Sequence, residues 1–124
     1  MNKRWKNFNE LDFVMCTPTC SISFMADSFM NRLQTARDIA GIPFVLTSAY
    51  RSKEYELSKG RSGTGMHTFG RAVDIKCTKS TDRYKIVDAC IKAGFTGIGI
   101  GPTFIHVDDR FYNNPENKPL IWLY

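Results

Sequence analysis

Apolar residues at helical spacing mark a first helix in the N-terminal third of the chain. They recur every three or four residues, and this spacing places them in one stripe on a helix surface. The stripe consists of Met25, Phe29, Leu33, Ala36 and Ala40. Ser21 or Ser23 can cap the N-terminus of this helix, and Gly41 followed by Pro43 ends it. We therefore predict one amphipathic helix that ends at Gly41 and turns its stripe towards the core.

A second helix is predicted over residues 80–93. Ser80 or Thr81 can cap it, and Gly94 follows its last turn. The residues expected on its inner face are Tyr84, Val87, Cys90 and Ile91. These two segments are the main helices that the pattern indicates.

Short runs of β-branched and aromatic residues predict the strands. They cover residues 11–15, 44–47, 72–75, 95–101, 104–108 and 120–124. The polar, glycine-containing stretch from 52 to 66 predicts a short helix at most, followed by a loop. Strands mixed with two helices indicate an α+β fold with a small antiparallel sheet.

The length and composition indicate one globular unit. The chain has 124 residues, 43% of them hydrophobic, which suits a single domain over 1–124 with its own core. Residues 1–12 are polar and basic and are expected to form an arm that packs Trp5 or Phe8 against the body. We expect a monomer.

The net charge excludes few classes of binding partner. The net charge of +5 suits an anionic partner, but the Lys and Arg residues are scattered, so we predict no nucleic-acid binding. No apolar run is long enough to insert into a membrane, since a span needs about 18 residues. The basic N-terminus is not followed by an apolar core, so we predict no signal peptide and synthesis in a cytoplasm.

Four cysteines raise the question of disulfides or a thiolate metal site. They are Cys16, Cys20, Cys77 and Cys90. Without an export signal, free and mostly buried thiols are expected. A local Cys16–Cys20 disulfide and a metal site using the four thiolates are the alternatives, although their spacing is not diagnostic.

The candidate chemistry lies in two segments that hold the only two histidines. His67 precedes Asp74 by seven residues, and His106 lies in the predicted strand 104–108. Alternation along a strand places Asp74 on the face opposite its apolar neighbours, where a carboxylate needs a partner. Two histidines and one aspartate suit Zn²⁺ when a fourth position stays open for water. We therefore predict that His67, Asp74 and His106 bind one catalytic zinc ion.

The same segments resemble a known family. Residues 65–74 read GMHTFGRAVD and are similar to the S-x-H-x-x-G-x-A-x-D signature of the zinc D-Ala-D-Ala carboxypeptidases. That family includes D,D-dipeptidases and phage L-alanyl-D-glutamate endopeptidases, and it shares a fold with the hedgehog signalling domain. Three further blocks fit in order over about residues 22–110: AR at 36–37 leading to GIP at 41–43, TSAYRS at 47–52, and FIHVDDR at 104–110.

The resemblance assigns roles to individual residues. It implies that His67, Asp74 and His106 are the zinc ligands and that Arg51 binds a carboxylate or carbonyl oxygen of the substrate, with Ser48 in the same pocket. Two positions depart from the family pattern. Gly65 replaces a serine, and Thr103 stands where many members carry a catalytic glutamate.

Asp108 is the remaining candidate for the general base. Alternation places it on the same face as His106. It can act as a base on the attacking water, or it can orient a ligand histidine or an arginine. The sequence leaves both roles open.

The resemblance implies a zinc metallopeptidase that cleaves peptidoglycan stem peptides, as a D,D-carboxypeptidase or an endopeptidase. The small size and positive charge resemble phage-encoded cell-wall enzymes, made in a host cytoplasm or carried in a virion. The alternative is a zinc-stabilised cell-wall or protein-binding module of the same fold with little or no catalysis. The two departures at Gly65 and Thr103 favour that alternative.

Overall fold

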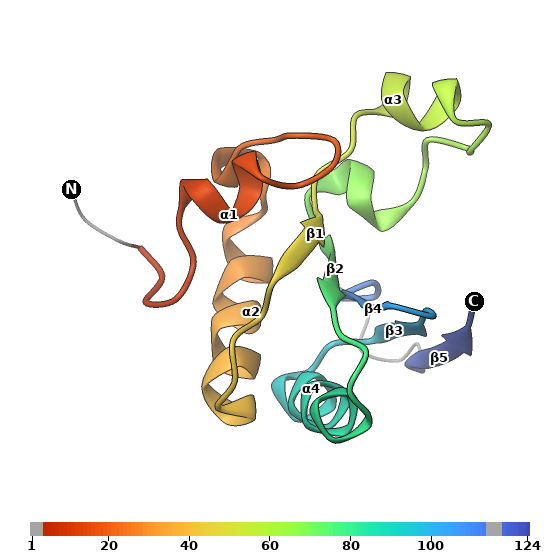
Figure 1. Cartoon of the computed structure of the whole chain (residues 1–124). Helices are drawn as coiled ribbons and strands as arrows, with labels where there is room; N and C mark the ends of the chain where they lie inside the picture. Colours follow the sequence, from red (N-terminus) through yellow and green to blue (C-terminus); the bar gives the residue numbers. More distant parts are fainter. Residues whose placement is uncertain (1–3, 114–117) are drawn as a thin grey trace.

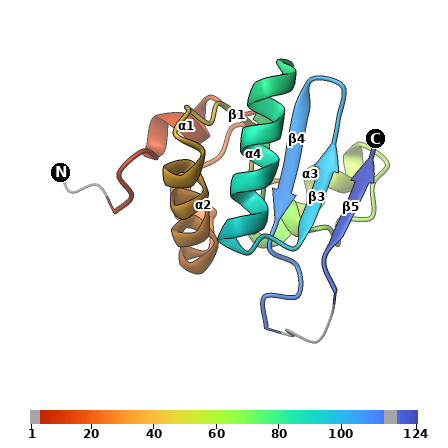
Figure 2. The same ribbon diagram turned by 90° about the horizontal axis from the view of Figure 1, so that it is seen from below.

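The structure is a computed structural model that describes residues 4–113 and 118–124. It has two layers, a sheet of five strands and a pair of helices packed on one of its faces (Figure 1, Figure 2). The sheet order is β1-β2-β4-β3-β5, with bounds β1 Leu46–Ser48, β2 Ala72–Lys76, β3 Gly97–Ile100, β4 Phe104–Asp108 and β5 Leu120–Leu123.

The predicted α+β class is confirmed, and one strand pair adds a feature of its own. β1–β2, β2–β4 and β3–β4 pair antiparallel, whereas β3 and β5 pair parallel. β4 ends and β5 begins at the same end of the sheet, because Gly97 pairs with both Asp108 and Leu120, so β5 runs parallel to β3 (Figure 2). β5 is therefore an edge strand, separated from the central strand β4 by β3 alone.

Both predicted main helices are present, and both end at the predicted glycine. α2 (Asp27–Ala40) and α4 (Ser80–Ala93) lie side by side on the sheet (Figure 2). Gly41 and Gly94 cap them with φ angles of 69° and 94°, which glycine adopts without steric cost. None of the helices in the described part of the chain is long and apolar enough to cross a membrane.

The start of α2 differs from the prediction. Its N-cap is Ala26, while Ser21 caps the separate 3₁₀ turn η1 (Ile22–Phe24) by accepting the Ser23 backbone N–H. The predicted stripe is otherwise correct, since Phe29, Leu33 and Ala36 are fully buried. A serine of the predicted pair does act as an N-cap, but it caps the 3₁₀ turn before the helix.

The predicted inner face of α4 was only partly right. Tyr84 and Ile91 are 76% and 58% exposed. The buried residues of this helix are Ile86, Ala89 and Cys90. Ile86 is buried while Ile91 is exposed, so the position of a residue around the helix, and not its hydrophobicity alone, decides which side chains face the core.

The N-terminal segment folds as a helix and not as the predicted strand over 11–15. α1 (Glu10–Val14) begins with a capping box, in which the Asn9 N–H donates to Asp12 Oδ2 (2.9 Å) and Asn9 Oδ1 accepts from the Leu11 N–H (3.0 Å). The predicted arm packs as expected, because Trp5 and Phe8 are 7% and 2% exposed. Residues 1–3 of this arm lie outside the described residues.

The core lies between the sheet and the helices. Val73, Ile75, Ile105 and Val107 are fully buried and point to the helices. All four cysteines are free and buried, as predicted. The opposite sheet face carries the other residues of β2 and β4, including Asp74 and His106. On that side of the molecule, α3 (Lys53–Ser58) and the 3₁₀ turn η2 (Met66–Phe69) lie beyond the end of β1 and β2 (Figure 1).

Candidate metal centre

The three predicted ligands come together from three different elements. Asp74 and His106 are direct cross-strand partners in β2 and β4, so their side chains share the sheet face that the helices leave free. His67 reaches them from η2, which the backbone bond from Arg51 N–H to the His67 carbonyl (3.2 Å) ties to the end of β1. The resulting His67–Asp74–His106 group has the composition of a metal site.

The donor atoms stand at distances that fit a zinc ion. His67 Nε2 lies 3.2 Å from His106 Nδ1 and 3.4 Å from Asp74 Oδ1, and His106 Nδ1 lies 3.1 Å from Asp74 Oδ1. Zinc bonds of about 2.0–2.1 Å in a tetrahedron place neighbouring ligand atoms about 3.3 Å apart. The residues present therefore fit this ion, with one tetrahedral position left over.

Each histidine is held by a second hydrogen bond that leaves the correct nitrogen for a metal. His67 Nδ1 donates to the Ala49 carbonyl (2.6 Å), and this leaves the Nε2 lone pair directed into the site. His106 Nε2 donates to Asp108 Oδ2 (2.6 Å), and this leaves Nδ1. Both imidazoles are 5% exposed, so their orientation is fixed by packing as well.

Asp108 lies behind His106, on the side away from the other two ligands. It is fully buried, and its two oxygens also accept hydrogen bonds from Arg110 Nε (2.9 Å) and Nη2 (2.8 Å). Burial opposes its ionisation, but the bonds with His106 and Arg110 outweigh burial and lower the pKa of Asp108 to about 2. The structure thus places this residue as an ionised hydrogen-bond partner of His106.

The protonation of the ligands follows from the same contacts. Burial opposes the charge on Asp74, but the hydrogen bonds from His106 and His67 outweigh it and lower the pKa of this carboxyl. Burial also disfavours a charged His106, yet the bonds with Asp108 and Asp74 prevail and raise its pKa. The ionised Asp74 carboxylate therefore favours a cation at this place, and a metal ion bound to Nδ1 would require His106 in its neutral form.

Arg51 forms one wall of the site. Its Nη1 lies 3.8 Å from Asp74 Oδ2 and donates to Ser48 Oγ (3.0 Å). Its Nε donates to Glu56 (3.1 Å), a 5% exposed residue of α3 that also pairs with Arg61. Both residues predicted for the substrate pocket, Arg51 and Ser48, are thus beside the ligand group.

Three neighbours of the site were not predicted from the sequence. Glu56 holds Arg51, Arg110 holds Asp108, and the ring centroid of Trp122 lies 5.4 Å from that of His106. For the stretch that holds Glu56, the sequence predicts a short polar helix at most, followed by a loop. No periodic pattern there indicates that the Glu56 side chain is buried. Trp122 reaches the site through the parallel β3–β5 pair, which the pattern did not indicate.

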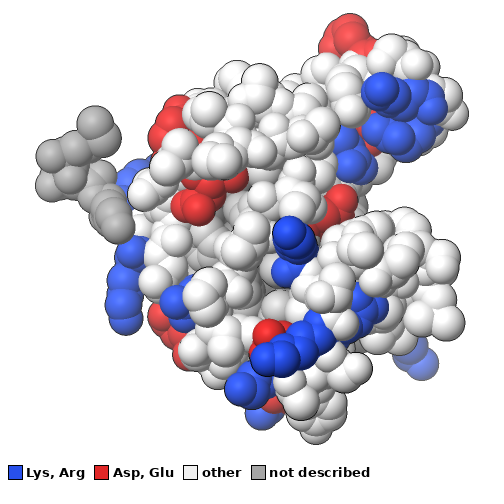
Figure 3. All heavy atoms as spheres, viewed as in Figure 1, with Lys and Arg blue, Asp and Glu red and all other residues white. Residues whose placement is uncertain are grey.

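The molecular surface is hollowed at this place. A notch separates the part of the surface over α3 from the part over β5, and Lys and Arg side chains gather on the α3 side (Figure 3). Exposed basic residues of that segment are Lys53, Lys59 and Arg61. These side chains give the α3 side of the notch a positive charge.

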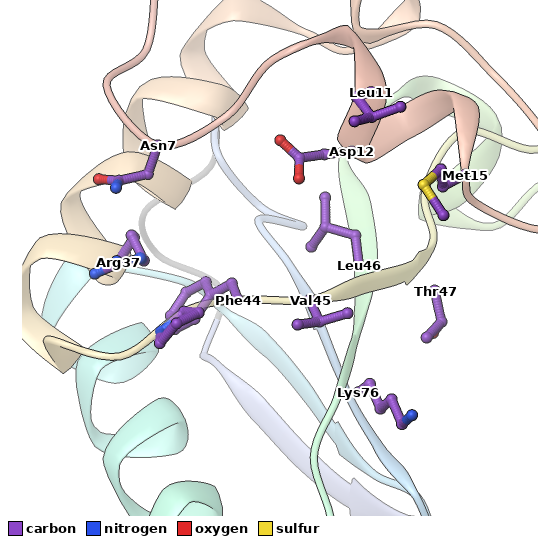
Figure 4. A pocket seen from close by; sticks show the side chains of 11 residues that line it. Asn7, Leu11, Asp12, Met15, Arg37, Phe44, Val45, Leu46, Thr47 and Lys76 are labelled. Atoms are coloured by element: carbon purple, nitrogen blue, oxygen red, sulfur yellow. The ribbon is translucent and has the colours of Figure 1, made fainter.

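A second depression lies elsewhere and has no part of the ligand group. It is bounded by α1, by the end of α2 and by β1, with Leu11, Met15 and Val45 among its apolar side chains (Figure 4). Its charged lining residues are Asp12, Arg37 and Lys76, of which Asp12 serves the cap of α1.

This helix-backed sheet thus presents two histidines and one aspartate around an open position, a group that can hold a single metal ion. The family model described as peptidase M15 matches residues 6–108, and the chain belongs to this family of zinc-dependent peptidases. No curated protein matches the chain. The matched range includes every predicted ligand but ends before β5.

Proposed function

We propose that this protein is a zinc metallopeptidase that hydrolyses a peptide bond in peptidoglycan stem peptides, as a carboxypeptidase or an endopeptidase. The observation that carries the proposal is the ligand group itself, whose donor atoms stand 3.1–3.4 Å apart beside an arginine. Stem peptides offer both groups that this site suits, a peptide carbonyl and a nearby free carboxylate.

Each residue of the site has a separate role in this proposal. His67, Asp74 and His106 hold the ion, which when bound activates a water molecule and polarises the scissile carbonyl. Arg51 binds the substrate carboxylate through its guanidinium, and Glu56 keeps that guanidinium in place. Ser48, whose oxygen accepts from Arg51, keeps its hydroxyl hydrogen free to donate to the same carboxylate.

We assign Asp108 to orienting His106. A general base needs an oxygen within hydrogen-bond reach of the attacking water. The Asp108 carboxylate is fully buried and is bonded to His106 Nε2, whereas Nδ1 faces the ligand group. This geometry supports the orienting role over the catalytic role that the sequence left open.

The same observation favours a second candidate function. Because Asp108 is turned away and Thr103 is an exposed residue before β4, neither supplies a base to the site. A zinc-stabilised module that binds cell-wall peptides with little turnover is therefore the alternative.

One experiment tests both. Purified protein is analysed for metal and incubated with purified peptidoglycan, with and without a chelator, and released fragments are identified by mass spectrometry. We expect one zinc per chain and a defined fragment that the chelator suppresses. One zinc without cleavage would favour the binding module, and absence of zinc after reconstitution would overturn the proposal.

A further inference from the structure

Two thiols lie together at the C-terminal end of α1. The backbone N–H groups of Cys16 and Cys20 both donate to the Phe13 carbonyl, at 3.1 and 3.2 Å. The Cys16 Sγ lies 3.3 Å from the Asp12 carbonyl oxygen, and the Cys20 Sγ lies 3.6 Å from the Phe13 carbonyl oxygen. These carbonyls belong to consecutive residues of one helix, so the two cysteines are held side by side.

The separation of the two residues suits a disulfide. Two nitrogen atoms bonded to one oxygen at these distances lie at most about 6 Å apart, and residues joined by a disulfide have Cα atoms about 4.4–6.8 Å apart. Both thiols are free in the structure. Thr17 and Thr19 between them are exposed, so the pair lies beneath one short surface loop.

The two thiols differ in their readiness to ionise. The hydrogen bond with the Cys16 thiol lowers the pKa of Cys20 to about 7, although burial opposes this, and the backbone N–H of Tyr50 acts in the same direction. The same thiol–thiol bond, together with burial, raises the pKa of Cys16. Because the thiolate is the nucleophile in thiol chemistry, Cys20 is the attacking thiol of the pair.

The other two cysteines lack this activation. Cys90 lies fully buried in α4, and burial raises the pKa of its thiol to about 12. Burial likewise raises the pKa of Cys77, which follows β2. These two residues therefore serve as internal controls for any reaction of the first pair.

The pair lies against the segment that supports the metal centre. The Tyr50 N–H hydrogen-bonds to the Cys20 sulfur. Tyr50 is preceded by Ala49, whose carbonyl accepts from His67 (2.6 Å), and is followed by Arg51. A disulfide sulfur carries no charge and accepts a hydrogen bond more weakly than a thiolate, so oxidation would loosen a contact next to both residues.

We propose that Cys16 and Cys20 form a redox-active dithiol that a low-molecular-weight disulfide, such as glutathione disulfide, oxidises reversibly to an intramolecular disulfide. The Cys20 thiolate attacks one sulfur of the oxidant, whose S–S bond breaks and releases one thiolate. The Cys16 thiol then gives up its proton, and its sulfur attacks Cys20 in the mixed disulfide and releases the second thiolate. The pair loses two electrons and two protons, and the oxidant becomes two thiols. This proposal is independent of the peptidase function.

The test is a redox titration of the folded wild-type protein. The protein is equilibrated without oxygen in mixtures of reduced and oxidised glutathione, then denatured and alkylated, and mass spectrometry maps the free thiols. All four thiols should be alkylated after the most reducing mixture, and only Cys77 and Cys90 after the most oxidising one. A return to reduced glutathione should restore all four. Four free thiols in every mixture, or a disulfide that includes Cys77 or Cys90, would overturn the proposal.

Three variants test the order of attack. In Cys16→Ser the reaction should stop at a glutathione adduct on Cys20, whereas in Cys20→Ser the adduct on Cys16 should form about tenfold or more slowly. Cys77→Ser is the matched control and should oxidise like the wild-type protein. A faster adduct on Cys16 would refute Cys20 as the attacking thiol. The wild-type titration needs no substitution, so it stays decisive if a variant fails to fold.

An NMR measurement tests the link to the metal-site segment. The amide proton of Tyr50 should move upfield on oxidation, because its hydrogen bond to the Cys20 sulfur weakens. The amide proton of Ile86, a buried residue of α4, is the control and should not move. An unchanged or downfield Tyr50 resonance in protein with the mapped disulfide would refute this link.

Discussion

At the scale of single residues, the hydrogen bond between His106 and Asp108 decides how the site works. The fully buried carboxylate fixes the ring so that Nδ1 faces Asp74 and His67. Partners of this kind raise the basicity of a ligand histidine and keep it in the binding orientation. A substitution of Asp108 should therefore lower the affinity for the metal, and it should lower turnover only as a consequence of metal loss.

We predict that Asp108→Asn weakens zinc binding about 10- to 100-fold, because an amide cannot compensate the developing positive charge on His106. Zinc affinity is measured by competition with a chromophoric chelator, and peptide hydrolysis is followed over a range of zinc concentrations. Hydrolysis should recover at saturating zinc. Asp88→Asn, at a partly exposed aspartate of α4 that pairs with Lys92, is the matched control and should change neither quantity. Lost turnover with unchanged zinc affinity would restore Asp108 as the base.

The residues of the site could be predicted only where their type is scarce or their motif is local. His67 and His106 are the only histidines, and Asp74 stands out as a carboxylate in an apolar strand. Glu56 and Arg110 are ordinary charged residues whose importance comes from the partner that the fold brings to them. No spacing in the sequence distinguishes them from charges on a solvated surface.

At the scale of elements, the short helix α3 acts as the support of Arg51. Ser52 caps it by accepting the Tyr55 backbone N–H, and Glu56 on its buried side pairs with Arg51 and Arg61. Burial opposes the charge of Glu56, but these ion pairs outweigh burial and lower its pKa below the ordinary 4.5. The ionised carboxylate therefore stabilises the fold above pH 4.5, and this contribution is lost as the pH falls through the lowered pKa.

We predict that Glu56→Gln lowers the free energy of unfolding by about 1–3 kcal/mol at pH 7, because two guanidinium groups lose their charged acceptor. The difference from the wild-type protein should shrink as the pH falls below 4.5. Urea unfolding at several pH values measures both. Glu54→Gln, an exposed glutamate in the same helix, is the control. Equal effects of the two substitutions would show that α3 does not depend on the buried pair.

The elements with strong periodic patterns were predicted well, and the others were not. α2 and α4 have 14 residues each, an apolar stripe and a terminal glycine, so local signals agree. α1 has five residues and a β-prone composition, and only the Asn9–Asp12 cap indicates a helix. The parallel pairing of β5 with β3 was not predicted, because no local sequence pattern indicates beside which strand β5 joins the sheet.

At the scale of the whole molecule, the metal ligands connect parts of the chain that are distant in sequence. His67 belongs to η2, and Asp74 and His106 belong to two central strands. A buried ion-pair group reinforces the same junction, since Asp109 accepts hydrogen bonds from Arg71 (2.7 Å) and from Arg32 of α2 (2.8 Å). A bound ion therefore cross-links η2 to the sheet and stabilises the folded state relative to the unfolded chain.

We predict that zinc raises the midpoint of thermal unfolding of the wild-type protein. A ligand present at about a thousand times its Kd adds about 4 kcal/mol to the free energy of unfolding, and this corresponds to about 10 °C or more for a domain of this size. Scanning calorimetry with and without zinc measures the shift. His67→Ala and His106→Ala each remove one of three ligands, so the shift should vanish in both.

Magnesium is the matched control ion, because it prefers an octahedron of oxygen ligands and this site offers two nitrogens and one carboxylate. It should leave the midpoint unchanged. A wild-type midpoint that is the same with and without zinc would mean that the three side chains form a hydrogen-bonded group without a metal. In that case the short His67–His106 contact of 3.2 Å would have to be a hydrogen bond between the two rings, with one imidazole donating to the other.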